Sequence, residues 1–373
     1  MPRPDDAPAA VGTRPLASHV KLYHQARTAH LERATGSPHV TVLYARRRYD
    51  FDESTAAGVD ARQASDREAA RLLAGAPPQV LELTEPAYLP GVRRAALALA
   101  AVEVRSLGRR GVRPRVVCYA IANSDPRREW QAHGLRGRAG RALSIGLSRW
   151  VHSRVDRIAF GTSAAEDLYG DLYRRTPRRQ RRMLVPALPA ACTCAQGEPP
   201  RPLSLLFLGA FATRKGFVEL LEAWPAVSSA VPGATLTLVG MGELAAQARE
   251  LAAADDHVEL VEDPPRPTIH AVLRRSSVLV LPSRPSATWR EQVGLPIVEG
   301  LQHGCTVVTS EQTGLAEWLL AHGHHVAPSS TGAAGLAAAL GAALLRPRDR
   351  EAVLADLPDR DGRSAAEEWM FGP

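Results

Sequence analysis

Apolar residues gather along this chain in short blocks, and these blocks alternate with stretches of helical periodicity. In the first half, apolar runs predict strands at 39–45, 80–83, 116–120, 157–161 and 183–186. Between them, apolar residues recur at helical spacing over 91–107 and 138–153, and the stretch 20–34 is also predicted to be helical. No clear strand precedes that first helix. Strands that alternate with helices are typical of βα units around a parallel sheet.

A second series of such units follows the segment 191–202, which is rich in proline and small residues and is typical of a linker. Strands are predicted within LSLLFLG, ATLTLVG, HVELV, SVLVLP, TVVTS and HHVAP, and helices at 215–224 and 243–253 follow the first two. Six strands complete a doubly wound sheet. A short amphipathic helix at 363–371 could pack back on the first half of the chain.

The predicted fold class is therefore α/β, with two doubly wound, Rossmann-like domains in series. We place a disordered tail at 1–18, an N-terminal domain at 19–195, a C-terminal domain at 203–350 and a terminal helical segment at 351–373. Ligands of such sheets bind outside the carboxyl ends of the strands, so we expect the site in a cleft between two facing domains.

The net charge of +7 is unevenly spread, because residues 101–190 contain 19 arginines, no lysine and only 7 acidic residues, a local net charge of +12. Such a stretch either attracts phosphates, nucleic acid or anionic lipid headgroups, or forms a solvated surface. No aromatic residue lies within the dense cluster at 178–182, which argues against single-stranded nucleic acid as a partner. We expect no nucleic-acid binding.

Four cysteines in 373 residues do not suggest a disulfide framework, and a reducing compartment fits them best. Cys192 and Cys194 are two residues apart, but neither a second pair nor a nearby histidine completes a zinc site in the sequence. His303 is interpreted as a packed or capping residue, and the histidines within 322–325 as a polar turn. We therefore expect no metal ion and no other cofactor.

The N-terminal segment has no apolar core typical of a signal peptide. The longest apolar run, at 332–345, is shorter than the roughly 20 residues that span a bilayer. We expect a cytoplasmic protein, and the arginine-rich N-terminal domain leaves open a peripheral contact with the inner membrane surface.

The strongest candidate for chemistry is RPSATWREQVGLPIVEGLQHG, at 284–304. Gly294 and Leu295 are predicted to open a helix, whose free N–H groups and partial positive charge can hold a diphosphate. Glu299, about one turn into that helix, could accept two ribose hydroxyls, and Glu291, just before it, could face a sugar. The alternative is a pair of unrelated surface glutamates.

A second candidate is FLGAFATRKGFVELLEAW, at 207–224. A buried strand runs into Gly209, and after a short loop Arg214 and Lys215 open the next helix. A cation at that point is well placed to bind phosphate oxygens. The alternative is a solvated lysine at the end of a helix.

The segment from Leu203 to Pro328 resembles glycosyltransferases of family 4, which have the two-domain GT-B fold. The resemblance rests on the strand–GxxxxxKG loop, the strand–GxG turn at 240–242, the E-x7-E segment and TSEQTGLAEWL, in that order. It implies a retaining transferase that uses a nucleotide-diphosphate sugar without a metal, in polysaccharide or glycoconjugate biosynthesis.

By the same resemblance, Glu299 is expected to bind the donor ribose and Glu291 to lie near the transferred sugar. Lys215 is expected to neutralise the diphosphate, with help from Arg214. Ala210 stands where the family often has an arginine, which leaves open the alternative of a catalytically inactive partner subunit that binds a nucleotide sugar.

The first half resembles the family only loosely. Residues 121–123 stand where a histidine is often found in the N-terminal domain, which bears on acceptor or sugar positioning. Glu85 and Asn123 follow predicted strands and are acceptor-side candidates, although each could equally satisfy local backbone groups. The acceptor is left undefined, with lipid-linked and phosphorylated compounds both open. The glycine turn Gly240-x-Gly242, read alone, would also fit an NAD(P) enzyme.

Overall fold

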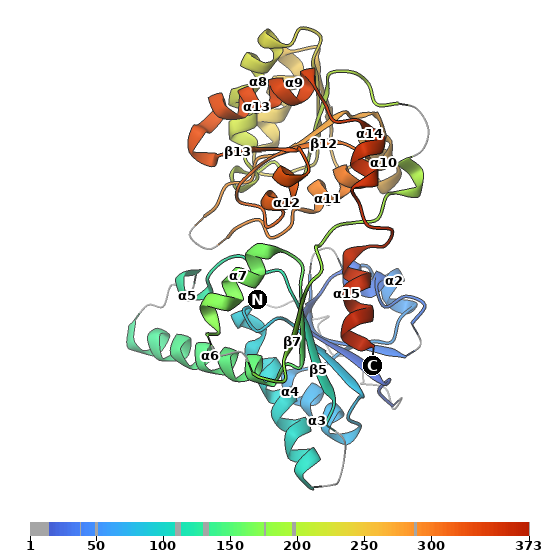
Figure 1. Cartoon of the computed structure of the whole chain (residues 1–373), viewed down its shortest axis with the longest axis vertical. Coiled ribbons are helices and arrows are strands. Elements are labelled where there is room, and N and C mark those ends of the chain that lie inside the picture. Colours follow the sequence, from blue (N-terminus) through green and yellow to red (C-terminus); the bar gives the residue numbers. More distant parts are fainter. Residues whose placement is uncertain are drawn as a thin grey trace. The chain divides into compact units, whose positions relative to one another are not determined.

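The computed structural model describes residues 15–37, 39–48, 51–108, 113–129, 134–174, 177–195, 199–286 and 289–372 (Figure 1). The chain divides into two compact units. Unit 1 consists of residues 1–160, 166–184 and 366–373, and unit 2 of residues 161–165 and 185–365. The tail predicted at 1–18 lies outside the described residues up to residue 14.

Unit 1 is built on a parallel sheet with the strand order β3-β2-β1-β4-β5-β6-β7. The strands are β1 His19–Ala26, β2 Val40–Arg47, β3 Ala61–Gln63, β4 Val80–Leu83, β5 Arg115–Ala120, β6 Arg157–Phe160 and β7 Arg181–Leu184. The helices are α1 Thr28–Glu32, α2 Glu53–Ala57, α3 Asp66–Gly75, α4 Leu89–Gly108, α5 Pro126–Glu129, α6 Gly134–Arg154 and α7 Ser163–Leu172. Helix α4 packs against both α3 and α6.

Unit 2 is built on a second parallel sheet with the order β10-β9-β8-β11-β12-β13. The strands are β8 Ser204–Leu208, β9 Thr235–Val239, β10 Val258–Val261, β11 Val278–Leu281, β12 Thr306–Ser310 and β13 His325–Ala327. The α-helices are α8 Phe217–Ala230, α9 Ala245–Ala254, α10 Arg266–Arg275, α11 Leu295–Gln302, α12 Ala316–Ala321, α13 Gly332–Leu345 and α14 Arg350–Ala355. The last helix, α15 Gly362–Phe371, begins in unit 2 and belongs to unit 1 from Ala366 onward. The 3-10 helices among the described residues are η1 Thr193–Ala195, η2 Thr213–Lys215 and η3 Ser329–Thr331.

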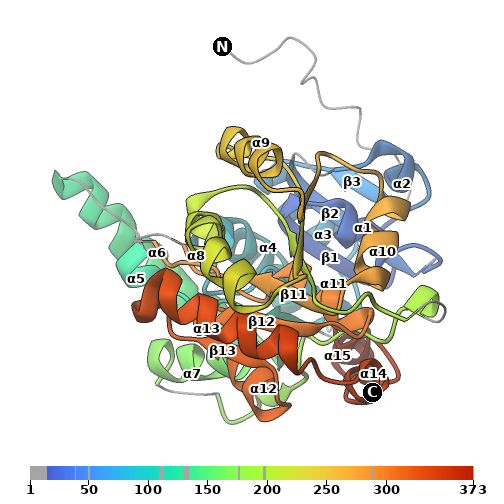
Figure 2. The same ribbon diagram turned by 90° about the horizontal axis from the view of Figure 1, so that it is seen from above.

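The strand order of unit 2 reverses between β8 and β11, as in a doubly wound fold. Right-handed crossovers then place the helices that follow β8 and β9 on one face and those that lead to β11 and β12 on the other. Helices α8 and α13 lie side by side (Figures 1 and 2). The prediction of two doubly wound α/β units is confirmed.

The helix predicted at 20–34 is wrong, because residues 20–26 belong to the inner strand β1 and only a short helix, α1, follows at Thr28–Glu32. Strand β1 pairs with β2 on one side and β4 on the other. Lys21 interrupts the apolar pattern of this strand, yet its side chain is 1% exposed. Its ammonium group lies 2.7 Å from the carboxylate of Glu367 and 3.9 Å from that of Glu82. The counter-charge from Glu367 is remote in sequence, so the local pattern could not reveal a buried strand.

Glu367 belongs to α15, whose last residues pack on unit 1. Arginines of β5 and β6 donate hydrogen bonds to carbonyl oxygens at the C-terminal end of this helix. Arg157 donates to the carbonyl oxygen of Trp369 at 2.6 Å, and Arg115 donates to that of Phe371 at 3.3 Å. Cationic donors at a helix C-terminus satisfy free carbonyl groups and complement the helix dipole. Part of the arginine-rich stretch therefore serves a structural role.

We expect Lys21→Met to destabilise the chain by about 3–5 kcal/mol, because it removes a buried ammonium group from beside the carboxylates of Glu82 and Glu367. The measurement is the free energy of unfolding from urea titration of the full chain. The matched control is Arg47→Met, which breaks an exposed ion pair with Glu53 and should cost less than about 1 kcal/mol. Equal effects of the two substitutions would contradict the structural role of Lys21.

A buried histidine makes the stability of unit 2 depend on pH. Nδ1 of His324 accepts a hydrogen bond of 3.0 Å from the backbone N–H of Val307, and the residue is 3% exposed. Burial and the nearby Arg348 lower the pKa of His324 to about 3. The unfolded chain takes up a proton at about pH 6.5, whereas the folded chain does not. This side chain therefore weakens folding increasingly as the pH falls from about 6.5 towards 3.

We expect His324→Asn, which keeps an acceptor for the Val307 N–H but does not titrate, to flatten the acid dependence of stability. Between pH 7.5 and pH 5.0, the wild type should lose up to about 2 kcal/mol more unfolding free energy than the variant. Chemical denaturation at the two pH values measures the difference, in which the fixed packing cost of the substitution cancels. Parallel pH profiles would show that His324 does not stay neutral in the folded chain.

Candidate functional site

The predicted site residues of unit 2 gather at the carboxyl ends of β8 and β11. These strands are neighbours in the sheet, although β9, β10 and their helices separate them in the sequence. From β8 the strand order runs outward through β9 and β10 to one edge of the sheet, and from β11 it runs through β12 and β13 to the other edge. The boundary between β8 and β11 is therefore the topological switch point, where doubly wound sheets bind ligands.

The loop after β8 packs closely against the end of β11 at a glycine. Gly216 has φ +71°, and a Cβ atom at this position would lie 2.0 Å from the carbonyl oxygen of Pro282, the first residue after β11. Only a residue without a side chain allows this close approach. The contact places η2, and with it Arg214 and Lys215, beside the loop that carries Glu291.

Lys215 and Glu291 form an ion pair with a distance of 2.5 Å between Nζ and Oε2. Both side chains are largely buried, at 13% and 10% exposure. Ser283 donates a hydrogen bond of 3.0 Å to the same carboxylate oxygen. The ring of Trp289 lies 5.2 Å from the Lys215 ammonium group and 5.0 Å from the Arg214 guanidinium group, within range of cation–π attraction. The structure thus brings together two cations and one carboxylate that the sequence places in separate segments.

Helix α11 begins where the sequence predicts. Gly294 is its N-cap with φ +84°, a proline occupies the first turn, and no side chain caps the helix. Leu295 is 65% exposed at this end. Glu299 lies about one turn in and forms an ion pair with Arg266 of α10. The N-terminal N–H groups of α11 are consequently not occupied by a capping side chain and can bind an anion.

A hollow of about 520 Å³ opens beside the loop after β8. It is lined by Ala212, Thr213, Arg214, Glu243, Arg284, Pro285 and Ser286. Its size is in the range of small-molecule sites, and both signs of charge are present on its walls.

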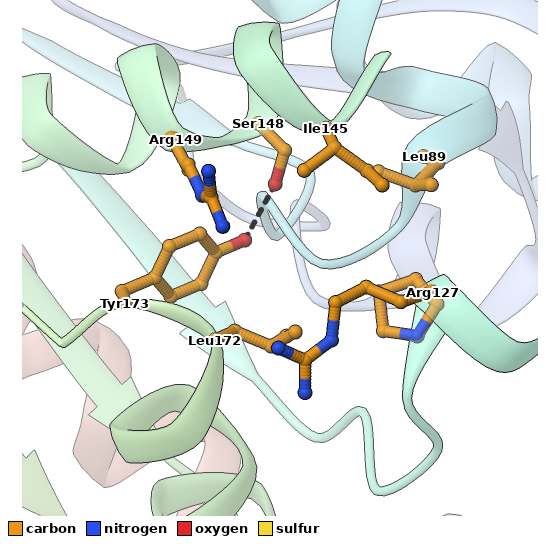
Figure 3. A pocket seen from close by; sticks show the side chains of 8 residues that line it. Leu89, Arg127, Ile145, Ser148, Arg149, Leu172 and Tyr173 are labelled. Carbon is orange, nitrogen blue, oxygen red and sulfur yellow. Dashed lines mark hydrogen bonds between the residues drawn. The ribbon is translucent and has the colours of Figure 1, made fainter. Parts of the chain in front are cut away.

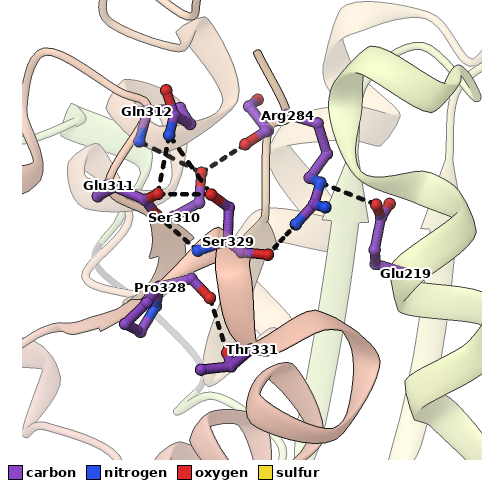
Figure 4. Close-up of polar contacts among 9 residues, drawn as sticks. Glu219, Arg284, Ser310, Glu311, Gln312, Pro328, Ser329 and Thr331 are labelled. Carbon is purple, nitrogen blue, oxygen red and sulfur yellow. Dashed lines mark hydrogen bonds and ion pairs between the residues drawn. The ribbon is translucent and has the colours of Figure 1, made fainter.

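Polar contacts tie the loops after β11, β12 and β13 together (Figure 4). Arg284 pairs with Glu219 at 2.9 Å and donates to the carbonyl oxygen of Ser329. The backbone N–H of Ser329 in turn donates to Glu311 at 2.7 Å. Burial alone would raise the pKa of Glu311, but hydrogen bonds from Ser329 and Gln312 lower it below its usual value. Glu311 is therefore held as a carboxylate at neutral pH.

The TSEQTGLAEWL segment contacts the E-x7-E segment directly. The hydroxyl of Thr313 donates to the carbonyl oxygen of Val293 at 2.8 Å, and the N–H of Gly314 donates to that of Gln292 at 2.8 Å. These bonds fix the two residues that precede Gly294. The segments that the sequence analysis singled out after β8, β11 and β12 therefore form one connected site.

The glycine turn at 240–242 has a steric explanation. A Cβ atom on Gly240 would lie 1.9 Å from the carbonyl oxygen of Gly209, and one on Gly242 would lie 2.3 Å from that of Phe211. The backbone N–H of Phe211 donates to the carbonyl oxygen of Met241. Both glycines are needed where the loop after β9 packs on the loop after β8, so their spacing does not require a bound dinucleotide.

Solved structures share this architecture over almost the whole chain. HepE from Anabaena in complex with UDP superposes with a TM-score of 0.63 at 12% sequence identity, over 94% of each chain. A UDP-forming α,α-trehalose-phosphate synthase from Burkholderia vietnamiensis also gives 0.63, at 14% identity over 95% of this chain and 99% of that one. The chain has the GT-B fold of glycosyltransferases.

Sequence comparisons add a family match for the second half of this GT-B chain. Residues 202–346 match the family described as glycosyl transferases group 1. A glycogen synthase from Mycobacterium tuberculosis is 32% identical over 158 residues, which are 39% of this chain. The chain spans about a third of the length of that curated relative, because the match covers 35% of the relative's residues. The segment that matches the family contains Lys215, Glu291 and Glu299.

Other residues of this GT-B site were not identified from the sequence. Trp289 and Ser283 contact the Lys215–Glu291 pair, and Arg284 lines the hollow. Their position in the sequence could have identified them, because all lie between the end of β11 and the start of α11, where ligand contacts of doubly wound sheets concentrate. No spacing rule distinguished them from other loop residues.

In unit 1, Glu85 has a clear structural role. Its Oε2 accepts hydrogen bonds from the N–H groups of Ile121 and Ala122, at 3.2 and 3.1 Å, and from the hydroxyl of Tyr169 at 3.2 Å. It therefore holds the loop after β5, which is the structural alternative considered for it. Asn123 in that loop is buried, with 7% exposure, and its acceptor role stays a prediction.

A small hollow in unit 1 lies between α4, α6 and α7. It measures about 10 Å³, room for about one water molecule, and the hydroxyls of Ser148 and Tyr173 share a hydrogen bond of 2.6 Å at its wall (Figure 3).

Among the residues that the structure describes, no helix is both long enough and apolar enough to cross a membrane.

The interpretation of the cysteines in unit 2 needs a correction. No histidine lies near Cys192 and Cys194 in the sequence, but the fold brings His270 and His303 to them, with the four ligand atoms within 4.8 Å of one another. His303 is indeed buried at the end of α11, where burial lowers its pKa to about 4 and its ring is neutral. Its Nε2 atom, however, faces Cys194 at 3.2 Å.

We expect Gly216→Ala to destabilise the chain by about 3 kcal/mol, the sum of left-handed strain and a clash with the Pro282 carbonyl group. Gly233→Ala is the matched control, since Gly233 also has a positive φ, +84°, but a Cβ atom there would lie no closer than 4.0 Å to its neighbours. The control should lose only about 1–2 kcal/mol. Unfolding free energies measure both, and similar losses would mean that the contact at Pro282 can relax.

Proposed function

We propose that this chain is a retaining glycosyltransferase of family 4 that transfers a sugar from a nucleotide-diphosphate donor. The observation that carries the proposal is the Lys215–Glu291 pair, at the start of α11 and within the segment that matches glycosyl transferases group 1. The GT-B fold is consistent with this activity but does not by itself define it.

The diphosphate is the leaving group, so catalysis depends on stabilising the negative charge that develops on it. Lys215 and the backbone N–H groups of Leu295 and Ile297, on either side of Pro296 at the start of α11, are preorganised donors for that charge. Arg214, which lines the hollow, supplies a second cation and can take the part of the arginine replaced by Ala210. Gly209 leaves space where the diphosphate approaches the backbone.

Glu291 is proposed to face the transferred sugar and to assist departure or placement of that sugar. Its carboxylate is held by Lys215 and Ser283, which fix its orientation before the donor binds. Glu299 is proposed to accept the ribose hydroxyls. Its ion pair with Arg266 is exposed on the arginine side, at 64%, so rearrangement around a bound ribose costs little.

UDP-sugars are the first donors to test. Neighbouring GT-B structures are described as complexes with UDP and with UDP-glucose, and another neighbour as a UDP-forming enzyme. We propose that the donor diphosphate is neutralised by protein cations and helix N–H groups, without a metal at the donor site.

The acceptor is proposed to bind on unit 1 and to be lipid-linked or phosphorylated, at the cytoplasmic membrane surface or in the cytoplasm. The arginine-rich stretch supports an anionic acceptor. Several of its arginines are engaged within unit 1, such as Arg113 with Asp156 and Arg154 with Glu103, so only the remainder can serve this purpose.

Ala210 supports one alternative, a partner subunit that binds a nucleotide sugar but does not transfer the sugar. The two functions share the donor site and differ in turnover. Release of nucleotide from a bound nucleotide sugar, with and without added acceptors, distinguishes them.

We expect isothermal titration calorimetry with UDP, GDP, ADP and dTDP to detect binding of one of these nucleotides. Lys215→Ala and Glu299→Ala should each weaken it about tenfold or more, which corresponds to about 1.4 kcal/mol. Lys215 loses a phosphate contact and Glu299 a ribose contact. If turnover is observed with a sugar donor, Lys215→Ala should lower it by about 10²–10³-fold.

Arg249→Ala and Glu262→Ala are matched controls, because these residues form an exposed ion pair of unit 2 that takes no part in the site described above. Both should leave nucleotide affinity unchanged. The proposal would be overturned if none of the four nucleotides bound, or if NAD(H) bound instead.

A further inference from the structure

A cluster of two cysteines and two histidines lies in unit 2, apart from the Lys215–Glu291 pair. Cys192 and Cys194 come from the segment around η1, His270 from α10 and His303 from the end of α11. None of the comparisons or the proposed donor site accounts for these four side chains. Three separate segments thus present two thiols and two imidazoles to one point.

Five of the six distances among the ligand atoms lie between 2.9 and 3.8 Å, and all six are within 4.8 Å. Sγ of Cys194 lies 3.3 Å from Nδ1 of His270 and 3.2 Å from Nε2 of His303, and the two nitrogen atoms are 3.0 Å apart. The two sulfur atoms are 2.9 Å apart, and Sγ of Cys192 lies 3.8 Å from Nδ1 of His270. With zinc bonds of about 2.3 Å to sulfur and about 2.0 Å to nitrogen, neighbouring ligand atoms are roughly 3.3–3.8 Å apart.

The orientation of His303 is that of a metal ligand with a supporting hydrogen bond. Its Nδ1 lies 2.7 Å from the backbone carbonyl oxygen of Glu299, so Nδ1–H is the donor and Nε2 carries the lone pair that points to the cluster. Histidines that bind metals usually donate their second ring N–H in this way. Arg350 donates to the carbonyl oxygen of His303 at 3.0 Å and fixes the residue from the other side.

We propose that Cys192, Cys194, His270 and His303 form a structural site for Zn²⁺. Two thiolates and two neutral imidazoles in tetrahedral arrangement favour this ion, and four protein ligands leave no open position for catalysis. Two thiolates also balance the charge of Zn²⁺. The ion would join η1, α10 and α11, and would add to the backbone hydrogen bond of 2.9 Å from Cys192 N–H to the Gln302 carbonyl oxygen.

The C-x-C spacing explains why the sequence did not reveal this site. Structural zinc sites commonly use C-x₂₋₄-C pairs, and here the histidines lie 76 or more residues beyond the cysteines, on separate helices. Neither histidine is near the other in the sequence. Only the packing of α10 beside α11 gives the four residues a common centre, so the inference depends on the fold and not on a motif.

The first test is the zinc content of the full chain, purified without chelators and measured by plasma mass spectrometry. We expect about one equivalent in the wild type and a roughly tenfold or larger loss in Cys194→Ser and His270→Ala. His257→Ala, which removes an exposed histidine of the same unit, is the control and should retain the ion. Wild type that holds no more zinc than Cys194→Ser, even after addition of Zn²⁺ and desalting, would overturn the proposal.

A second test uses only the wild type, in case the variants fold poorly. After removal of metal with a chelator, Co²⁺ should bind in a 1:1 ratio with the intense visible bands of a tetrahedral site and a thiolate charge-transfer band, and Zn²⁺ should displace it. Zn²⁺ should also protect Cys192 and Cys194 from alkylation. Weak octahedral Co²⁺ bands, or alkylation that saturating Zn²⁺ does not slow, would contradict the site.

Discussion

The ion pair between Lys215 and Glu291 is the contact on which the proposed donor site depends. Both groups are largely buried, and neither would be stable there alone, because an unpaired buried charge costs several kcal/mol. Each therefore fixes the position of the other, and the pair links the loops after β8 and β11. A diphosphate that enters the site meets an ammonium group already held in place, so little reorganisation is needed when charge develops on the leaving group.

Steric constraints on glycines explain why the loops around that pair meet so closely. Gly216 lies against the Pro282 carbonyl group, and Gly240 lies against that of Gly209. Neither contact provides much energy, but any side chain at these positions would force the loops apart. The close approach of the loops thus requires the absence of side chains at these glycines, whereas the Lys215–Glu291 ion pair provides the attraction between the loops. Steric fit and charge pairing together account for a site in which several segments converge.

The sequence predicted the parallel sheets well because buried parallel strands are continuous apolar runs, such as β11, in which every residue is buried. It failed at β1, where Lys21 is buried only because α15 supplies Glu367. The same limit applies to the cysteines, whose histidine neighbours come from α10 and α11. Helix starts and loop glycines are local features and can be predicted, whereas partners brought by tertiary packing cannot.

Helix α11 connects the proposed donor site with the proposed metal site. A helix of eight residues has little intrinsic stability, so its orientation must come from its surroundings. Gly300 packs against Leu279, with only 3.0 Å available for a Cβ atom, and Arg350 and the η1 segment hold the C-terminal end. Glu299 contributes to both proposed sites, since its side chain is proposed to bind the ribose while its carbonyl group orients His303. A metal at the C-terminal end would therefore act on the donor site by restricting tilt of the helix, and not by contact with the nucleotide.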